Sequence, residues 1–522
     1  MMRKITLLLS ALAFSVLCVV SALATPQADD AAIVRNLDVF NSLYKELNTY
    51  YVDSLAPEHA IETALQAMLG ELDPYTEYIP AKEAEDFMVV STGQYGGIGS
   101  YIIERKDSLH RGVYISSPSE GSPAARAGLR AGDKFIMIDG DSTAGWSSEN
   151  VSKRLKGQPH TSVHLVMQRP YAADSILTFD IMRETIDMNP VPYYGVTHGD
   201  IGYIVLTTFN EHSAARVREA LVALKKDPRV KHIVLDLRGN GGGSEAEAVS
   251  LVNMFVPSGK TVVTNKGKIR QATHEYKTMT EPLDTLMPIV VLVNGESASA
   301  SEITCGALQD LQRATVIGTR TYGKGLVQVP IDLPYNTNVK ITTSRYYLPS
   351  GRSIQGTGVS PDVEVKLDTI PNIAYYLSGS GLDSTEVMFD YVVDYITRHP
   401  TIAPAAEFHL SDADYADFKQ RVIKSGFSYD AVSKKQFDEL VKTAKFEGYY
   451  DEARSAFDAL EARLKHDVAL ELDRHEKIVR QMLESDIIAA YYYQSGTLEA
   501  ALSYDKQLKE AVRVLQEKKQ GK

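Results

Sequence analysis

The sequence predicts a multidomain α/β protein, in which a β-rich module lies between N-terminal helices and an α/β core, and a helical domain follows the core. The first observation is the length of 522 residues, which exceeds that of a single domain. The second is an alternation of apolar strand-like runs with helix-like segments between residues 189 and 367, which is typical of a parallel sheet covered by helices. The third is a block of short, glycine-punctuated strands just before that alternation.

The composition limits the class of partner. Hydrophobic residues make up 44% and charged residues 23% of the chain, which is the balance of an ordinary globular protein. The formal net charge is -12, and the only basic cluster is the short tail from Glu517 to Lys522. Because phosphate binding requires clustered lysine and arginine, we expect no nucleic acid partner.

Residues 1–24 are predicted to be a signal peptide. Arg3 and Lys4 precede an apolar run over residues 5–20, and Ala22-Leu23-Ala24 then provides the small-x-small pattern of a cleavage site. The alternative is a retained membrane anchor, for which the apolar run is slightly short. We therefore expect export to the periplasm or cell envelope. Cleavage after Ala24 would remove Cys18, leave Cys305 alone and exclude an internal disulfide.

Residues 28–90 are predicted to form an N-terminal helical region. Apolar side chains recur at helical spacing along one face of a first helix, and again along a second helix that ends before Asp73-Pro74. The two faces consist of Leu37, Phe40, Leu43, Leu47 and Tyr50, and of Ile61, Leu65, Met68 and Leu72. Such a face serves either as core or as an oligomerisation arm, and the sequence favours core packing.

Residues 91–185 carry the β-rich module. Its landmarks are a glycine-rich turn, a short helix that ends in Ala127-Gly128-Leu129, and the segment Gly132 to Gly140. With these landmarks, the module resembles a PDZ domain. The resemblance places the carboxylate-binding loop at Gly96, Gly97, Ile98 and Gly99, where backbone N–H groups would converge on a terminal carboxylate. The alternative for the glycine-rich turn alone is a simple hairpin.

Residues 186–367 are predicted to be the α/β core, and residues 368–522 a helical C-terminal domain. The expected core strands are Ile201–Leu206, Ile233–Leu237 and Ile289–Val293. The helices expected between them are Ala214–Lys225 and Glu245–Phe255. The C-terminal domain shows charged and aromatic residues at helical spacing, and its role is left open.

A short polar run in the core is the first candidate for chemistry. Ser297 to Glu302 lies between the strand Ile289–Val293 and a helix-like stretch, and Lys324 follows between two glycines. A serine at such a turn is exposed beside the first N–H groups of the helix, which stabilise an oxyanion. A nearby lysine makes a nucleophile and base pair the leading hypothesis. The alternative is helix capping, and three serines compete for the nucleophile: Ser297, Ser299 and Ser301.

A glycine-rich loop is the second candidate. The buried strand that ends at Arg238 runs into Gly239-Asn240-Gly241-Gly242-Gly243. No P-loop spacing is present, so the loop is predicted to contribute to an oxyanion hole rather than to cradle phosphate. Asp236 and Arg238 are expected to shape the turn as structural partners.

Taken together, these motifs resemble the carboxyl-terminal processing peptidases, also called tail-specific proteases. The resemblance runs from Val39 to Val365 and depends on separated motifs in the family's order. Those motifs are Leu72 to Thr76, Tyr95 to Gly99, the PDZ module, Asp236 with its glycines, Ser297 to Glu302, Gly323-Lys324-Gly325 with Gln328, and Tyr347 to Gly356.

The resemblance implies a serine endopeptidase whose α/β protease core carries an inserted PDZ module. The nucleophile falls on Ser299, the general base on Lys324, and the residue that orients the base on Gln328. The oxyanion donors fall on the N–H groups of Ala300 and of a loop glycine, for which Gly242 is favoured. Burial of a lysine lowers its pKa from about 10.4 and makes it a base. Asp310 matches a family position without an assigned role.

This reading needs no cofactor and no metal. The implied substrates are proteins or peptides with free C-terminal tails, and homo-oligomers through helical arms and an envelope adaptor are further implied partners. Two alternatives remain open: an inert PDZ scaffold, and a crotonase-like acyl-CoA enzyme with a glycine-rich oxyanion loop. A Ser-His-Asp triad lacks a recognisable pattern around any of the twelve histidines.

Overall fold

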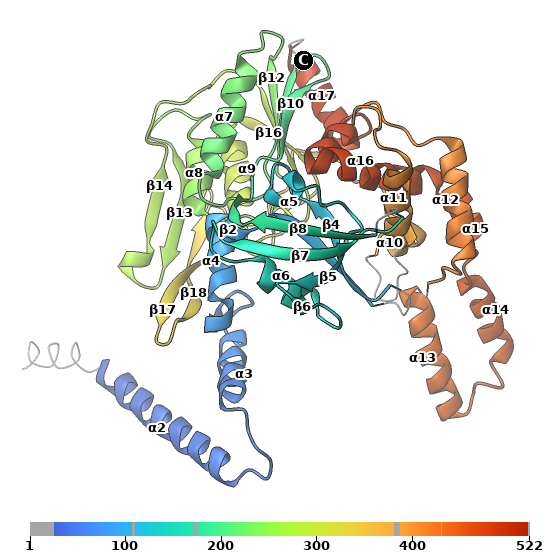
Figure 1. The fold of residues 1–522 in the computed structure, drawn as a ribbon. Helices are drawn as coiled ribbons and strands as arrows, with labels where there is room; N and C mark the ends of the chain where they lie inside the picture. Colours follow the sequence, from blue (N-terminus) through green and yellow to red (C-terminus); the bar gives the residue numbers. More distant parts are fainter. Residues whose placement is uncertain (1–25, 107–109, 172–174, 380–386, 430, 520–522) are drawn as a thin grey trace, which may run out of the picture. The chain divides into compact units, whose positions relative to one another are not determined.

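The computed structural model describes residues 26–519, except for 107–109, 172–174, 380–386 and 430 (Figure 1). The predicted signal peptide, residues 1–24, lies outside the described residues. The chain divides into two compact units. The smaller contains the N-terminal region up to Ala84 together with Gln328–Thr342, and the larger contains the rest.

The smaller unit contains two helices and a strand that precede the rest of the fold. They are α2 (Pro26–Tyr50), α3 (Pro57–Gly70) and β1 (Glu77–Ile79), followed by the short 3-10 helix η1 (Ala81–Glu83). β1 pairs antiparallel with the first part of β18 (Thr337–Tyr347), where Glu77 lies opposite Lys340 at 2.8 Å between their charged groups. The strand β17 (Leu326–Leu333) pairs with β18. The turn between α3 and β1 is held by the Asp73 carboxylate, which accepts hydrogen bonds from the N–H groups of Tyr75 and Thr76.

The apolar face of α2 is not core. Leu37, Leu43 and Tyr50 are 58%, 56% and 78% exposed, and Phe40 and Leu47 are also exposed. The core packing favoured by the sequence is therefore wrong for this helix. The spacing predicts an amphipathic helix but does not say what its apolar face meets.

The β-rich module forms one sheet in the strand order β3-β4-β5-β7-β8, with β6 beside β5, while β2 pairs with β9. Its strands are β2 (Gln94–Gly97), β3 (Ser100–Arg105), β4 (Gly112–Pro118), β5 (Lys134–Ile138), β6 (Asp141–Ser142), β7 (Ser162–Gln168), β8 (Ile176–Met182) and β9 (Glu184–Asp187). Its helices are α4 (Ala84–Thr92), α5 (Pro123–Arg126) and α6 (Ser148–Leu155). Ile115, Phe135, Ile138 and Leu165 are fully buried between them.

The α/β core is built on a six-stranded sheet in the order β10-β11-β12-β15-β16-β19. All neighbours after the first pair are parallel, as the alternation of strands and helices predicts. The strands are β10 (Tyr193–Thr197), β11 (Ile201–Val205), β12 (His232–Asp236), β15 (Ile289–Val293), β16 (Ala314–Gly318) and β19 (Val363–Glu364). The helices packed with them are α7 (Ser213–Lys225), α8 (Glu245–Val252) and α9 (Ala300–Asp310).

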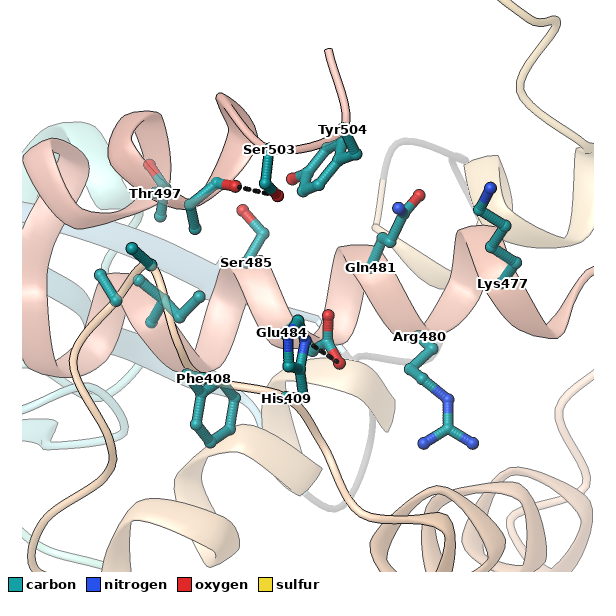
Figure 2. A pocket seen from close by; sticks show the side chains of 14 residues that line it. Phe408, His409, Lys477, Arg480, Gln481, Glu484, Ser485, Thr497, Ser503 and Tyr504 are labelled. Carbon is teal, nitrogen blue, oxygen red and sulfur yellow. Dashed lines mark hydrogen bonds and ion pairs between the residues drawn. The ribbon is translucent and has the colours of Figure 1, made fainter. Parts of the chain in front are cut away.

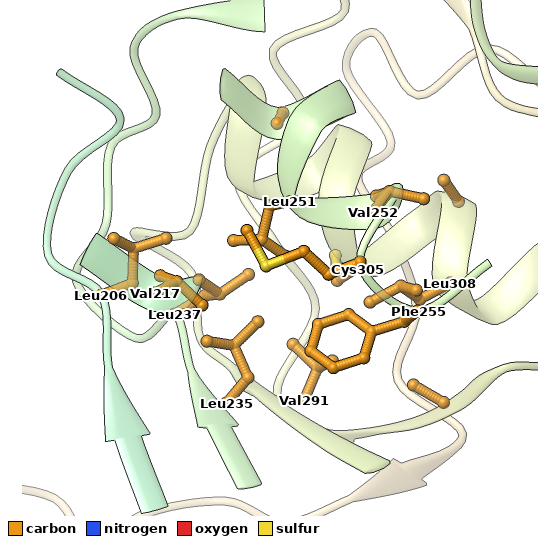
Figure 3. Packing of buried hydrophobic residues seen from close by; sticks show 14 of the residues in the cluster. Leu206, Val217, Leu235, Leu237, Leu251, Val252, Phe255, Val291, Cys305 and Leu308 are labelled. Carbon is orange, nitrogen blue, oxygen red and sulfur yellow. The ribbon is translucent and has the colours of Figure 1, made fainter. Parts of the chain in front are cut away.

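One face of this sheet and the three helices enclose the largest apolar cluster (Figure 3). Leu235 and Val291 contribute from neighbouring strands, and Phe255 and Cys305 meet them from the helical side. Cys305 is a buried free thiol whose pKa is raised because burial disfavours the thiolate. It is therefore part of the core packing rather than a reactive group.

A second sheet extends the core. β13 (Thr261–Gly267) pairs with β14 (His274–Lys277) and with the second part of β18, where Asn265 lies opposite Tyr346. A 3-10 turn, η2 (Arg270–Ala272), connects β13 to β14. This pairing places β18 beside the polar turn that precedes α9, because the Tyr346 hydroxyl donates to the Ser299 carbonyl oxygen at 3.2 Å.

The chain ends in a helical domain, and with it the predicted mixed α/β fold is confirmed (Figure 1). Its helices are α10 (Asn372–Leu377), α11 (Val387–Arg398), α12 (Asp412–Lys424), α13 (Val432–Glu447), α14 (Arg454–Leu464), α15 (Val468–Arg474), α16 (Glu476–Ala501) and α17 (Lys506–Lys519). Arg105 of the β-rich module forms an ion pair with Asp390 of α11 at 2.5 Å. Within the described residues, every helix is too short or too polar to span a bilayer.

Candidate active site

Two of the three competing serines are structural. Ser297 and Ser301 are fully buried, and their hydroxyls donate to the carbonyl oxygens of Leu237 and Asn240, each at 2.8 Å. These bonds tie the turn before α9 to the end of β12. A hydroxyl committed to a buried carbonyl does not meet a substrate, which leaves Ser299 as the candidate nucleophile.

Ser299 has the backbone of a strained turn. It lies at the N-terminal cap of α9 with φ 54° and ψ -113°, a region that residues with a Cβ rarely occupy. Its side chain is half-buried, in contrast to its two serine neighbours. A sharp strand-to-helix turn of this kind presents a serine hydroxyl beside free N–H groups of the helix start.

Glu302 explains how this turn is held, and the sequence does not reveal its role. The side chain is fully buried, and its carboxylate accepts four hydrogen bonds. One oxygen accepts from the Thr321 hydroxyl at 2.5 Å and the Gly323 N–H at 2.8 Å. The other accepts from the N–H groups of Ser299 and Lys324, each at 2.9 Å. Burial raises the pKa of Glu302, although these donors offset part of the rise.

The backbones of Ser299 and Lys324 are joined on two sides. The Glu302 oxygen bridges their N–H groups, and the hydroxyl of Tyr346 reaches the carbonyl oxygens of both residues. Lys324 itself is half-buried between Gly323 and Gly325, which are buried. The structure therefore brings together the two residues that the sequence assigns to the nucleophile and the base.

The other two polar residues that the sequence singles out have separate contacts. Gln328 lies on β17 in the smaller unit, and its amide nitrogen donates to the Thr342 hydroxyl at 3.0 Å. Its action on the base stays a prediction. Asp310 is at the opposite end of α9 from Ser299 and forms an ion pair with Arg352 at 2.8 Å. This position gives Asp310 a structural role in the fold.

The glycine-rich loop packs directly against the serine turn. Gly242 has φ 99°, and a Cβ added there would lie 2.6 Å from the Ala298 carbonyl oxygen and 2.8 Å from the Ser299 Cβ. Only glycine fits a backbone position of this kind. The loop backbone thus approaches the candidate nucleophile as closely as an oxyanion hole requires.

The N–H groups near Ser299 differ in their partners. Ala300 N–H, the first of α9, makes no hydrogen bond within the described part of the chain. Gly242 N–H, favoured from the sequence as the second oxyanion donor, donates instead to the Asn240 side-chain oxygen at 2.9 Å. Its neighbours Gly241 and Gly243 donate no hydrogen bond among the described residues. In this conformation, Ala300 and the two flanking glycines carry the N–H groups that remain open to a ligand.

The predicted peptide-binding loop lies between two strands of the β-rich module. Gly96 and Gly97 end β2, and Ile98 and Gly99 turn into β3. Gly99 has φ 72°, and no hydrogen bond from the N–H groups of Ile98 or Gly99 occurs in the part of the chain that the structure describes. β3 is the edge strand of its sheet and contacts α6. An extended peptide can pair with such an edge.

A cavity of about 300 Å³ lies elsewhere, in the helical domain (Figure 2). It is bounded by two parts of α16, which bends at Tyr493, and by the loop that carries Phe408. Its described lining contains none of the predicted site residues. The candidate active site is therefore defined by the side chains around Ser299, and this cavity is separate from it. No group of three or more described histidine, cysteine, aspartate or glutamate side chains is arranged to hold a metal ion.

Comparison with known proteins places the chain in a family. Residues 200–365 match peptidase family S41, residues 114–169 match a PDZ domain, and residues 379–515 match the C-terminal helical domain of probable PDZ-proteases. A carboxy-terminal-processing protease of Bartonella bacilliformis is 34% identical over 369 residues, which are 70% of this chain and 83% of that protein. The chain belongs to peptidase family S41. It is a serine-type peptidase with a PDZ domain.

Two further proteins are similar to this chain. A probable CtpA-like serine protease of Staphylococcus aureus is 35% identical over 353 residues, covering 66% of this chain and 69% of that protein. The solved photosystem II D1 C-terminal processing protease is 31% identical and covers 64% of this chain and 93% of that chain, with a TM-score of 0.37. The family assignment favours a peptidase over both alternatives, the inert scaffold and the acyl-CoA enzyme.

Proposed function

We propose that this S41 peptidase is an exported endopeptidase that uses Ser299 as nucleophile and Lys324 as general base, and that selects proteins by their C-terminal tails. The observation that carries the proposal is the pair of bridges between the two residues. One Glu302 oxygen accepts from both N–H groups, and the Tyr346 hydroxyl contacts both carbonyl oxygens. Such a double bridge holds the backbones of the two residues close together, as a nucleophile and its base require.

The reaction follows from the chemistry of the two side chains. The Ser299 oxygen attacks the peptide carbonyl carbon while its proton passes to the neutral Lys324 amine. The carbonyl oxygen becomes an oxyanion, for which Ala300 N–H is an open donor at the start of α9. Lys324 then protonates the leaving amine. Water then attacks the resulting ester and passes a proton to Lys324, which returns it to the Ser299 oxygen as the acyl C–O bond breaks and the new carboxyl terminus leaves.

Tail selection would come from the PDZ domain. The free edge of β3 offers backbone groups to an extended peptide, and the open N–H groups of Ile98 and Gly99 lie where that strand begins. These N–H groups suit a terminal carboxylate, which is the chemistry of β-strand addition with carboxylate capture. We therefore assign proteins with a free, apolar C-terminus as substrates.

The test compares two versions of one unfolded reporter protein, which end in an apolar or a charged tail. Wild-type protein from Thr25 onward is expected to cleave the apolar-tailed version on the order of 100-fold more efficiently, because tail capture raises the effective concentration of the chain at Ser299. The same assay with Ser299→Ala gives the background. Its tail binding, measured by fluorescence anisotropy, should equal that of wild type.

The outcomes separate the parts of the proposal. Equal cleavage of both reporters would reject tail selection but keep the peptidase. Cleavage that survives Ser299→Ala would reject the nucleophile. Tail binding without any cleavage, even at high enzyme concentration, would contradict the proposed activity of the free enzyme and would point to a requirement for an adaptor.

Export is the part of the proposal that depends on residues 1–24. The basic residues, apolar run and small-x-small pattern of that segment support it. We expect the protein recovered from the cell envelope of an expressing bacterium to begin at Thr25, as determined by mass spectrometry of its N-terminal peptide. Recovery of the intact N-terminus in the membrane fraction would instead identify an anchor.

Self-association through α2 is a further part of the proposal. Ile33, Leu37, Phe40 and Leu47 recur at spacings of four, three and seven residues, the pattern of a coiled-coil seam, and all four are exposed. A second copy of the chain would cover this stripe. We expect light scattering to give a mass above the 57.5 kDa of one full chain, and Leu37→Asp with Leu47→Asp to reduce it to that of the monomer. Ser42→Asp, a polar position of α2, should leave the mass unchanged.

A further inference from the structure

The last described helix, α17, packs against one face of the protease sheet. Along β15, Val290 and Leu292 point to one face and Val291 to the other. The second face is covered by α17, from which Leu508, Ala511 and Leu515 are buried against the strands. A sheet of this kind is stable only when both faces are covered. The C-terminal domain therefore supplies a structural layer of the protease core.

The segment that leads into α17 also reaches the start of the glycine-rich loop. The Arg238 guanidinium donates to the Asp505 carboxylate at 2.5 Å and to the Gln507 amide oxygen at 3.0 Å. Gln507 is fully buried, and its amide nitrogen donates to the Val365 carbonyl oxygen at 2.7 Å. A buried amide bonded on both sides has one orientation, so Arg238 is held from a fixed position.

Arg238 is held on its other side by its own strand. Its guanidinium donates to both oxygens of Asp236, at 2.6–3.1 Å, and to the Tyr203 hydroxyl at 3.2 Å. Burial opposes the charge, yet Asp236 and Asp505 keep the pKa of Arg238 above its ordinary value. The arginine thus links the end of β12 to Asp505 through charge-assisted bonds, which are the stronger kind.

Along the chain, the link is followed by the glycine-rich loop, which contacts the turn that presents Ser299. Two residues after Arg238, Asn240 is fully buried and accepts hydrogen bonds from Ala298 N–H at 3.0 Å and from the Ser301 hydroxyl at 2.8 Å. Its side chain holds Gly242 N–H. A shift of Arg238 therefore moves Asn240, and with it both the loop and the turn that presents Ser299.

We propose that Asp505 and Gln507 are positioning residues for catalysis, which act through Arg238 on the loop and turn around Ser299. The C-terminal helix then sets the turnover rate of the active site as well as covering the sheet. The proposal rests on the assignment of Ser299 as nucleophile. It differs from a purely structural ion pair, which would affect stability but not the rate of the folded enzyme.

The test uses the chain from Thr25 with Asp505→Asn, which keeps the size of the side chain and removes its charge. We expect kcat on a tail-bearing peptide to fall about tenfold, with KM unchanged. This loss is smaller than the roughly 100- to 1000-fold that complete removal of an oxyanion donor costs, because the donor is displaced and not removed. Hydrogen exchange should become faster in the peptide covering residues 237–244 and stay unchanged in β5 of the PDZ domain. Glu510→Gln is the matched control, since this residue of α17 pairs only with Arg513 in the described structure; its kcat should equal that of wild type.

Each outcome decides the matter. A folded Asp505→Asn protein with wild-type kcat and a lower melting temperature would show a merely structural ion pair and overturn the proposal. If Asp505→Asn does not fold, Asp505→Glu replaces it, for which a smaller loss of kcat at constant KM is expected and an unchanged kcat would contradict the proposal. Absence of cleavage by wild type, by contrast, would reject the function assigned to Ser299 and not the role of Asp505.

Discussion

Replacing Lys324 with arginine is expected to abolish peptide cleavage as completely as replacing it with alanine. Arginine has most of the length of the lysine side chain, but it stays charged because it does not lose its proton in proteins, and so it cannot accept one from Ser299. Because a nucleophile and its base act as a unit, we expect kcat to fall on the order of 10⁴-fold or more in Lys324→Arg, Lys324→Ala and Ser299→Ala alike. Steady-state cleavage of a tail-bearing peptide measures this loss.

A second lysine provides the control for the arginine exchange. Lys340 pairs with Glu77 on the surface of the smaller unit, and Lys340→Arg keeps that pair. Its activity should match that of wild type. Tail binding should be unchanged in all variants, because Lys324 belongs to the core and not to the PDZ domain. Activity of Lys324→Arg within tenfold of wild type would remove Lys324 as the base.

Local sequence patterns were enough to predict the strands that carry the site. The run Ile289–Val293 is predicted and observed over the same five residues, because a strand buried on both faces of a parallel sheet is continuously apolar. The serine turn and the glycine-rich loop could also be located from the sequence, because each directly follows a predicted buried strand. These features depend on neighbouring residues, and the sequence contains that information directly.

Features that depend on distant partners were not predictable. The partners of the Glu302 carboxylate include Thr321 and Lys324, which are 19 and 22 residues further along the chain. Arg238 and Gln507 are 269 residues apart. From the sequence alone, a glutamate near a helix start is typical of a helix cap, and an arginine after a strand is typical of a turn. What each one meets depends on how the later loop and helix pack.

The choice among the three serines also depends on partners that are distant in the sequence. The hydroxyls of Ser297 and Ser301 contact carbonyl groups at the end of β12 and in the glycine-rich loop, 60 and 61 residues away. The resemblance to a family selected Ser299 from the sequence. Among the three serines, only Ser299 combines a strained backbone with a side chain that is not fully buried, which supports the proposed assignment.

Substitution of Glu302 is expected to produce the second large loss of activity. Glu302→Ala removes the acceptor that holds the N–H groups of Ser299 and Lys324 at 2.9 Å, and so releases the nucleophile and the base from each other. A displacement of about 1 Å between reacting groups costs about 100-fold in rate. We expect at least this loss in kcat, with tail binding retained. Glu296→Gln, an exposed glutamate in the same turn, should keep full activity and serves as the control.

Stability measurements separate the charge of Glu302 from its shape. Glu302→Gln has nearly the same shape, but its amide NH₂ faces N–H and O–H donors, and the unmet bonds should cost about 1–3 kcal/mol of unfolding free energy at neutral pH. Chemical denaturation of both proteins measures the difference. Equal stability of the two proteins, with equal activity, would contradict the bridging role of the carboxylate.

The pH dependence of this difference has a definite sign. Because burial raises the pKa of Glu302 above its unfolded value, the folded protein takes up this proton at a higher pH than the unfolded chain does. The stabilisation from that proton is fully present below the unfolded pKa and is lost as pH rises through the folded pKa. Glu302→Gln lacks it, while all other carboxyl groups titrate in both proteins. The advantage of wild type over Glu302→Gln in unfolding free energy should therefore be larger at about pH 4 than at about pH 7. A constant difference across this range would mean that the buried carboxyl group titrates as it does in the unfolded chain.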